Sequence, residues 1–215
     1  PFRTPDPRLQ SVREIRFGNF ELMDGFLREW EAISNVEYSE AVPIMRSHYT
    51  PNDVSWLQWH LTTIGANQAW DFTKGNPNIL IAIVDDALLM THEDMAPKIY
   101  TNPNEIPGNG IDDDNNGFID DVNGWDAADN DNDPSSPGGA FGHGTHVAGI
   151  AAAATDNGTG IASIGFNVSI VPCKSKLDAN IGNPNLDNTY GALDYAIAIG
   201  ADAANMSFGG SFSIT

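Results

Sequence analysis

Two short stretches of this sequence carry side chains that can move protons. Residues 142–149 read Gly-His-Gly-Thr-His-Val-Ala-Gly, so His143 lies between two glycines that let backbone and substrate approach it closely. Residues 79–84 are six consecutive apolar residues, and Asp85 follows them directly. A histidine that a carboxylate orients can act as a general base near neutral pH. We therefore take Asp85 and His143 as a candidate catalytic pair.

The plainer alternatives are that His143 only begins a helix and that Asp85 and Asp86 only begin a turn. We expect His146, one helical turn after His143, to be a core residue on the small-residue side of the helix. A zinc hydrolase built on these two histidines is excluded. The helical zinc motif needs histidines four residues apart with an intervening glutamate, and these are three apart without one.

The elements that must position this pair alternate between strands and helices. The run of residues 79–84 predicts a fully buried strand of the parallel kind. Small apolar residues 147–154 predict a tightly packed helix with His143 at its first turn. Residues 168–171 and 201–206 predict two more strands, separated by a helix over 189–199 that Gly200 ends. The predicted fold class is α/β with a central parallel sheet, and functional residues lie at the carboxyl ends of such strands.

Composition excludes several classes of protein. The formal net charge of −19 excludes a nucleic-acid-binding face, which needs clustered basic residues. No run approaches the roughly 20 apolar residues of a membrane-spanning helix. The single cysteine, Cys173, excludes an internal disulfide and is expected to be a small buried apolar residue.

Negative charge is concentrated in one stretch. Residues 112–133 hold nine aspartates, and no lysine or arginine occurs between Lys98 and Lys174. The sequence from Asp112 places oxygen-bearing side chains at alternate positions and a glycine sixth, which is the first part of a calcium loop. The expected ligands are Asp112, Asp114, Asn116 and Asp120. Asn123 stands where an EF-hand has its bidentate glutamate, so the loop is not an EF-hand; the alternative is a solvated acidic loop.

The motifs, taken together, resemble the subtilisin family of serine proteases (peptidase S8), in its thermitase-like branch. The similarity rests on Ile-Ala-Ile-Val-Asp ending at Asp85, His-Glu-Asp-Met at 92–95, the motif at 143–149, and Asn-Met-Ser-Phe-Gly-Gly at 205–210. It implies a three-layer fold, with Asp85 as the triad aspartate and His143 as general base. It also implies that the backbone of Ser207, Phe208 and Gly209 pairs with an extended substrate peptide.

The same resemblance implies two further calcium sites. A medium-affinity loop would use Asp126, Asp129, Asp131, Asp133 and Ser135, with a disordered acidic linker as the alternative. A tight site would join three distant parts of the chain. Its ligands would be the side chains of Asp53, Asp94 and Asn157 and the carbonyls of Ala154, Thr159 and Ile161.

The sequence departs from the family in two places. Ala87 replaces the glycine usual two residues after the triad aspartate, which bears on the turn there. The nucleophile motif Gly-Thr-Ser-Met-Ala does not occur in residues 1–215, and Ser207 matches the substrate edge instead. We therefore expect residues 49–215 to be the N-terminal part of a peptidase domain, inactive without its serine.

Residues 1–48 are expected to lie outside the catalytic domain. Residues 20–33 carry apolar side chains at helical spacing, and residues 36–43 read as extended. They resemble the end of a pro-segment that inhibits its own protease; a helical extension of the main domain is the alternative. The resemblance implies a secreted, monomeric, calcium-stabilised endopeptidase acting on proteins or peptides. The competing interpretation is a non-catalytic calcium-binding module on the same fold.

Overall fold

The computed structural model describes residues 23–37, 39, 49–53 and 58–210, and the chain forms two compact units, Pro1–Ser47 and His48–Thr215. In the first unit, helix α1 (Met23–Glu31) lies inside the predicted helix, and the rings of Phe26 and Trp30 stack at 5.3 Å between centroids. Most of the predicted extended segment, residues 36–43, falls outside the described residues.

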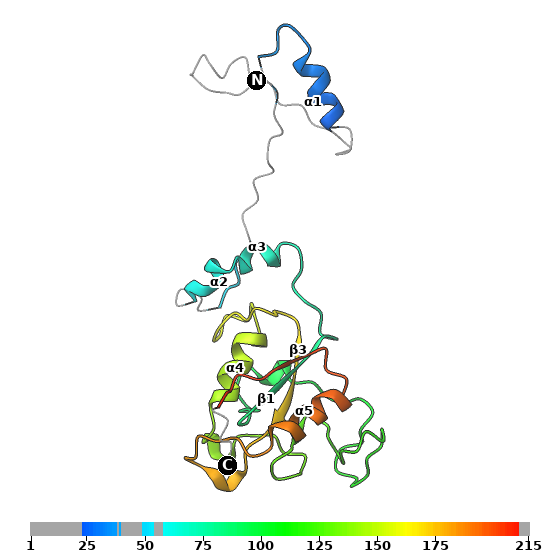
Figure 1. The fold of residues 1–215 in the computed structure, drawn as a ribbon, viewed down its shortest axis with the longest axis vertical. Coiled ribbons are helices and arrows are strands. Elements are labelled where there is room, and N and C mark those ends of the chain that lie inside the picture. The colour runs from blue at the N-terminus through cyan, green and yellow to red at the C-terminus, as the bar shows by residue number, and fades with distance from the viewer. Residues whose placement is uncertain (1–22, 38, 40–48, 54–57, 211–215) are drawn as a thin grey trace. The chain divides into compact units, whose positions relative to one another are not determined.

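The second unit is built on a parallel sheet. Its strands are β1 (Leu80–Asp85), β2 (Trp125–Asp126), β3 (Ser169–Lys174) and β4 (Ala203–Asn205). Their order is β2-β3-β1-β4, and neighbouring strands pair in parallel (Figure 1). The α/β fold class predicted from the apolar runs is confirmed.

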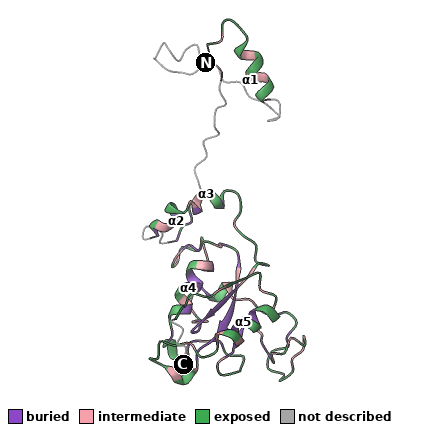
Figure 2. Cartoon of the chain, viewed as in Figure 1, coloured by how far each residue is buried: buried purple, intermediate pink, exposed green. Residues whose placement is uncertain are grey.

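Two helices cover opposite faces of this sheet (Figure 1). Helix α4 (His143–Ala152) follows β1 and packs with Ile83 and Ile170, whereas α5 (Thr189–Ala198) follows β3 and packs with Val84 and Val171. Successive strand side chains point to opposite faces, so each strand contributes to both layers. The buried strands between the two helices are visible in Figure 2. The result is three layers, helix on sheet on helix.

Short elements complete the unit. Helices α2 (Trp59–Thr63) and α3 (Ala66–Trp70) pack through Trp70 against Phe166. Three single-turn 3₁₀ helices occur at η4 (Ala96–Lys98), η5 (Pro137–Gly139) and η6 (Asp178–Asn180). Among the helices of the described residues, none has the length and apolar character that crossing a bilayer requires.

The strand register aligns charged residues along one edge of the sheet. Asp85 at the end of β1 pairs with Lys174 at the end of β3, and Lys174 pairs with Asp126 at the end of β2. Residues 207–209 follow β4 at the same edge, because all four strands run in one direction. This carboxyl edge is therefore where the polar residues of the sheet gather.

Candidate active site

The carboxyl edge of the sheet brings Asp85 and His143 into contact. The distance between Asp85 Oδ1 and His143 Nδ1 is 2.8 Å. Asp85 is only 3% exposed, whereas the His143 side chain is 56% exposed. The Asp85 carbonyl also accepts hydrogen bonds from the backbone N–H and the hydroxyl of Ser175, which anchors the strand end. A buried carboxylate thus holds an imidazole whose other nitrogen is free to face solvent.

The pair perturbs the protonation of both groups. The hydrogen bond to Asp85 raises the pKa of His143 above its usual 6.5, because it stabilises the imidazolium. Burial raises the pKa of Asp85, although the hydrogen bond from His143 opposes that shift. Asp85 Oδ2 is buried and has no hydrogen-bond partner among the described residues, which adds to the cost of its charge. The arrangement suits a base that works above the pKa of His143.

Asp86 holds the start of the helix that carries His143. Its Oδ1 accepts the N–H of Gly144 at 2.7 Å, and its Oδ2 accepts the N–H of His143 at 3.2 Å. Gly142, at the cap position of α4, makes no side-chain capping bond, so a residue 57 positions away in sequence caps the helix instead. The sequence offered no signal for this role beyond the second aspartate itself.

Gly144 allows the close approach that this clamp needs. A Cβ atom at this position would lie 2.4 Å from the carbonyl oxygen of Ala87 and 3.0 Å from Asp85 Cβ. Real atoms do not approach so closely, so any larger residue would push α4 away from the end of β1. The glycine therefore helps set the distance between Asp85 and His143.

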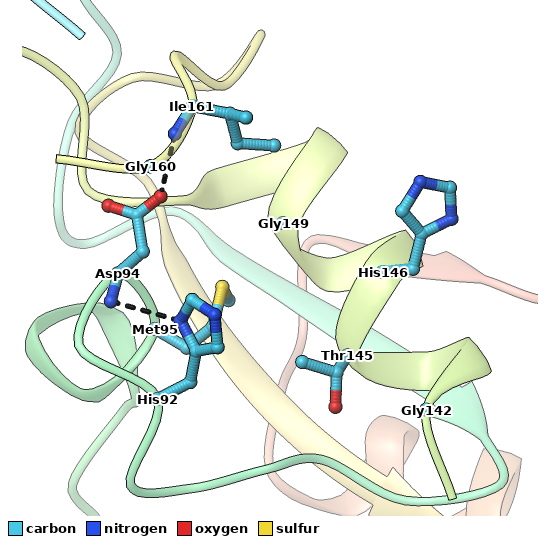
Figure 3. A pocket seen from close by; sticks show the side chains of 9 residues that line it. All are labelled: His92, Asp94, Met95, Gly142, Thr145, His146, Gly149, Gly160 and Ile161. Atoms are coloured by element: carbon cyan, nitrogen blue, oxygen red, sulfur yellow. Dashed lines mark hydrogen bonds between the residues drawn. The ribbon is translucent and has the colours of Figure 1, made fainter. Parts of the chain in front are cut away.

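The prediction that His146 is a core residue is wrong. His146 is exposed, and it lines a cavity of about 300 Å³ together with His92, Met95 and Ile161. In Figure 3 its ring points away from the helix axis. The buried positions of α4 are Gly144, Ala148, Gly149 and Ala152. At about 100° per residue, His146 falls outside the arc that they span.

The predicted substrate edge follows β4. Ser207, Phe208 and Gly209 are exposed and belong to no helix or strand, and Ser207 Oγ donates to Asn205 Oδ1 at 2.6 Å. Because β4 pairs with β1 in parallel, these residues and Asp85 leave the sheet at the same edge. An exposed extended backbone of this kind can pair with a peptide.

The three segments expected to form the tight calcium site converge. Asp53 accepts the N–H groups of Asp156 (2.7 Å) and Asn157 (3.2 Å). Asp94 Oδ1 accepts from the Asn157 side-chain amide at 2.9 Å, and Asp94 Oδ2 accepts the N–H of Ile161 at 3.0 Å (Figure 3). Asp53 and Asp94 are both buried, and Asn157 lies between them.

Gly160 shapes the same region. Its φ is +56°, and a Cβ atom there would lie 2.1 Å from Asp94 Oδ2. The carbonyls expected to serve as ligands, those of Ala154, Thr159 and Ile161, belong to the same loop, and the N–H of Ala154 donates to the Asp94 carbonyl. Two buried carboxylates, one amide and a glycine turn suit a hard cation with oxygen ligands.

In the 112–121 loop, the expected ligands divide into two groups. Asp112 accepts the N–H groups of Asn116 and Gly117, and both oxygens of Asp120 accept N–H groups of residues 109 and 110. Asp114 instead lies with Glu105 and Asp121, with oxygens within 4.8 Å of one another. The sequence reasoning did not include Glu105 or Asp121.

In the medium-affinity loop, a lysine accompanies the carboxylates. The ammonium of Lys174, 1% exposed, bonds Asp126 and Asp178, and its Nζ is 3.8 Å from Asp129. The three carboxylates form a second group that could hold a metal ion. Asp131 and Asp133, together with Ser135, hold the turn that follows: Asp131 accepts the N–H of Asp133, and Asp133 that of Ser135. The acidic clusters of the described residues can hold a metal, and one of them already contains an internal cation.

Comparison with known proteins gives the class of this chain. The family model described as Subtilase family, Peptidase S8, matches residues 76–214, a range that includes Asp85, His143 and residues 207–209. The chain belongs to the subtilase family.

Three relatives have related sequences. The chain is 35% identical over 176 residues to the Thermophilic serine proteinase of Bacillus sp. (strain AK1), covering 81% of this chain and 37% of that protein. It is 38% identical over 165 residues to Thermitase of Thermoactinomyces vulgaris, covering 76% and 49%. It is 30% identical over 187 residues to the Halolysin-like extracellular serine protease Nep of Natrialba magadii, covering 86% and 31%. The chain therefore spans less than half the length of each.

Solved structures agree on the fold. Proteases from Pseudoalteromonas arctica superpose with a TM-score of 0.54 at 25% identity, covering 78% of this chain and 53% of that one. A lanthipeptide protease superposes with a TM-score of 0.52 at 19% identity, covering 79% and 43%. The three-layer α/β architecture is that of subtilisin-like proteases.

Proposed function

We propose that this chain supplies the aspartate and histidine of a serine endopeptidase. The observation that carries the proposal is the 2.8 Å contact between the buried Asp85 and the solvent-facing His143 at the carboxyl edge of the sheet. Membership of the subtilase family supports it. Because the chain covers only part of its relatives, we assign the nucleophilic serine to sequence beyond Thr215.

Each member of the pair has a defined part in the mechanism. Asp85 accepts the Nδ1–H of His143, which leaves the lone pair on Nε2. Nε2 takes the proton of the serine hydroxyl as its oxygen attacks the scissile carbonyl, and the imidazolium then gives that proton to the leaving amine. Asp85 stabilises the imidazolium during both steps. Water then attacks the acylated serine: Nε2 takes the proton of the water and gives it to the serine oxygen, which leaves Nε2 unprotonated again.

The substrate would lie along the exposed backbone after β4. Within the described part of the chain, the N–H and C=O groups of residues 207–209 make no backbone hydrogen bond, so they can pair with an extended peptide. Such pairing would bring the scissile bond to the edge that carries Asp85 and His143. Protein or peptide substrates follow from this mode of recognition. The exposed His143 supports it, since a base at this edge must reach a bond outside the sheet.

We propose calcium as a structural ion at the site of Asp53, Asp94 and Asn157, with the carbonyls of Ala154, Thr159 and Ile161. All these groups offer oxygen, the ligand that calcium prefers. A bound ion would neutralise the two buried carboxylates and tie residues 52–53, 94 and 154–161 together. Calcium would therefore stabilise the fold without entering the proton transfers.

We also propose that residues 1–48 are the end of an inhibitory pro-segment and that the protein is secreted and monomeric. The division of the chain after Ser47 supports the separate role of the first unit. The word extracellular in the name of the Natrialba magadii relative supports secretion. Size-exclusion chromatography tests whether the protein is monomeric. Adding the isolated peptide of residues 1–48 to the protease tests whether this segment inhibits it.

The test of the proposed chemistry uses the full-length protein. A fluorophosphonate should label one serine beyond Thr215, and peptide hydrolysis should fall on the order of 10⁴-fold in both Asp85→Asn and His143→Ala. The matched control is Asp194→Asn, an exposed carboxylate on α5, which should hydrolyse peptide at the normal rate. Near-normal kcat in Asp85→Asn would refute the assignment of the catalytic pair. No hydrolysis and no labelled serine in the unmodified full-length protein would instead favour the non-catalytic calcium-binding module.

A further inference from the structure

A cluster of three carboxylates includes neither Asp85 nor His143. Glu105, Asp114 and Asp121 each place one oxygen within 4.8 Å of the other two. Glu105 is 6% exposed and Asp121 is fully buried. Three like charges in such a place repel one another in a medium that screens them poorly. The fold therefore needs something to balance them.

One oxygen of this cluster has no partner. Glu105 Oε1 accepts the N–H of Asp113 at 2.8 Å and that of Asp114 at 3.2 Å, which holds the carboxylate in place. Glu105 Oε2 is buried and makes no hydrogen bond within the described part of the chain. A buried carboxylate oxygen without a hydrogen bond is costly, so its position favours the binding of a cation there.

No protein cation reaches these carboxylates within the described ranges. Lys98 Nζ donates to the Phe166 carbonyl at 2.8 Å, and Lys174 bonds Asp126 and Asp178. The neutral amide of Asn102 donates to Asp114 (2.9 Å) and Asp121 (3.1 Å), and the amide of Asn116 donates to the same two residues. Amides orient the two aspartates but leave the charge of the cluster uncompensated.

The spacing suits calcium. Calcium binds oxygens at about 2.3–2.6 Å, so two ligands on opposite sides of one ion are about 5 Å apart. Oxygens within 4.8 Å of one another can therefore share one ion. Carboxylates without nitrogen or sulfur favour a hard cation over a transition metal.

We propose that Glu105, Asp114 and Asp121 form a calcium site that ties residues 102–105 to the 112–121 loop. This set of ligands differs from the one read from sequence spacing, because the carboxylate oxygens that lie together are those of Glu105, Asp114 and Asp121. The loop also carries Phe118, whose ring lies 5.1 Å from that of Trp125 and 4.9 Å from that of Tyr195, in the core under α5. Calcium bound here orders a loop that covers that core.

The proposal goes beyond the protease assignment and is tested without activity. The full-length protein carries His143→Ala to prevent self-digestion, and calcium binding to the metal-free protein is titrated by calorimetry. Glu105→Gln and Asp121→Asn should each lose one calcium or bind it at least ten-fold more weakly. The control is Asp113→Asn in the same loop. The Asp113 carboxylate accepts hydrogen bonds from Ile106 and Asn109 and does not belong to the cluster, so this variant should keep every calcium.

Thermal melting separates a ligand from a merely structural residue. In EDTA, Glu105→Gln should melt at or above the temperature of the unmodified chain, because one of three repelling charges is gone. In calcium, it should melt below that chain. Equal losses with and without calcium would overturn the proposal, and so would unchanged calcium affinity in both Glu105→Gln and Asp121→Asn. If Asp94→Asn removes a different calcium, the two sites are independent.

Discussion

Replacing Asp86 tests whether a side chain that touches no reacting atom positions His143, the proposed general base. Its carboxylate, 8% exposed, accepts three backbone N–H groups, those of Ala87 (2.8 Å), His143 (3.2 Å) and Gly144 (2.7 Å). Asp86→Ala removes all three acceptors at once. Asp86→Asn keeps one oxygen acceptor and removes the charge. The two variants therefore separate a complete loss of the hydrogen bonds made by the Asp86 carboxylate from a partial loss.

The structure allows the loss to be sized. A helix cap contributes about 1 kcal/mol, and hydrogen bonds to a charged acceptor contribute about 1.5–3 kcal/mol each. Recovery of the carboxylate's solvation offsets part of this loss, so we expect Asp86→Ala to cost about 2–3 kcal/mol. For a unit of this size that lowers Tm by roughly 5–10 °C. Asp86→Asn should cost about 1 kcal/mol, since it loses one acceptor and the interaction with the helix dipole.

The assay combines stability with kinetics in the full-length protein. Asp86→Ala should lower kcat/KM on the order of 10- to 100-fold, because a small shift of His143 spoils its alignment. The negative charge of Asp86 also contributes to raising the pKa of His143. Asp86→Asn should therefore move the acid limb of the kcat/KM profile to lower pH. Asp85→Asn is the comparison: it should lose far more activity with little loss of Tm.

Two results would refute this reasoning. A melting temperature within about 1 °C of the unmodified protein in Asp86→Ala would show that the clamp does not hold α4, given the magnitudes above. A loss of activity equal to that of Asp85→Asn at unchanged Tm would show that Asp86 takes part in the chemistry. Circular dichroism of each variant confirms that it is folded before either result is interpreted.

Three further predictions concern pH, calcium and the buried lysine. Hydrogen bonding raises the pKa of His143 above 6.5, so its protonated form stabilises the folded state below pH 6.5, and this stabilisation is lost as the pH rises through the pKa of the folded state. By contrast, kcat/KM should rise over the same pH range, because the general base must be unprotonated. A half-maximal kcat/KM below pH 6.5 would contradict this prediction. EDTA should lower Tm, since calcium at about a thousandfold above Kd stabilises the fold by roughly 4 kcal/mol. Gly160→Ala, which crowds Asp94, should reduce the increase in Tm that calcium produces. An equal increase in this variant and in the unmodified protein would argue against the site. Lys174→Met should lower the free energy of unfolding by about 3–5 kcal/mol, because Asp126 stays buried without its partner. Calorimetry should show that added calcium restores part of this stability. No destabilisation in this variant would contradict the pairing of Lys174 with Asp126.

Local sequence patterns were sufficient for the sheet and for the two catalytic candidates. The apolar run of residues 79–84 predicted a fully buried strand that ends at Asp85. Strand β1 does end at Asp85, but only its residues 82–85 are buried, because Leu80 and Ile81 are half-buried and Ile79 is exposed. The small residues after His143 likewise required a closely packed helix. These inferences rest on neighbours in the chain, and the positions of β1 and α4 agree with them.

Local patterns misjudged which side of a helix is buried. His146 directly precedes the apolar run of residues 147–154, and its place one helical turn after His143 predicted burial on the small-residue side. The buried arc of α4 is defined by its contacts with β1 and β3, which place His146 toward solvent. The four ligands expected from the spacing of residues 112–120 stay a prediction, and Asp114 also lies with Glu105 and Asp121, which that spacing did not include.

By itself, the sequence determined the α/β class, the candidate pair Asp85 and His143, and the presence of acidic clusters, because each depends on residues close together in the chain or on a highly specific motif. Only the tertiary structure decided which distant charges meet. Asp86 caps a helix 57 residues away, Lys174 enters a group of carboxylates, and Glu105 joins Asp121. Such meetings depend on strand register and loop closure, in which a shift of one residue would separate the partners.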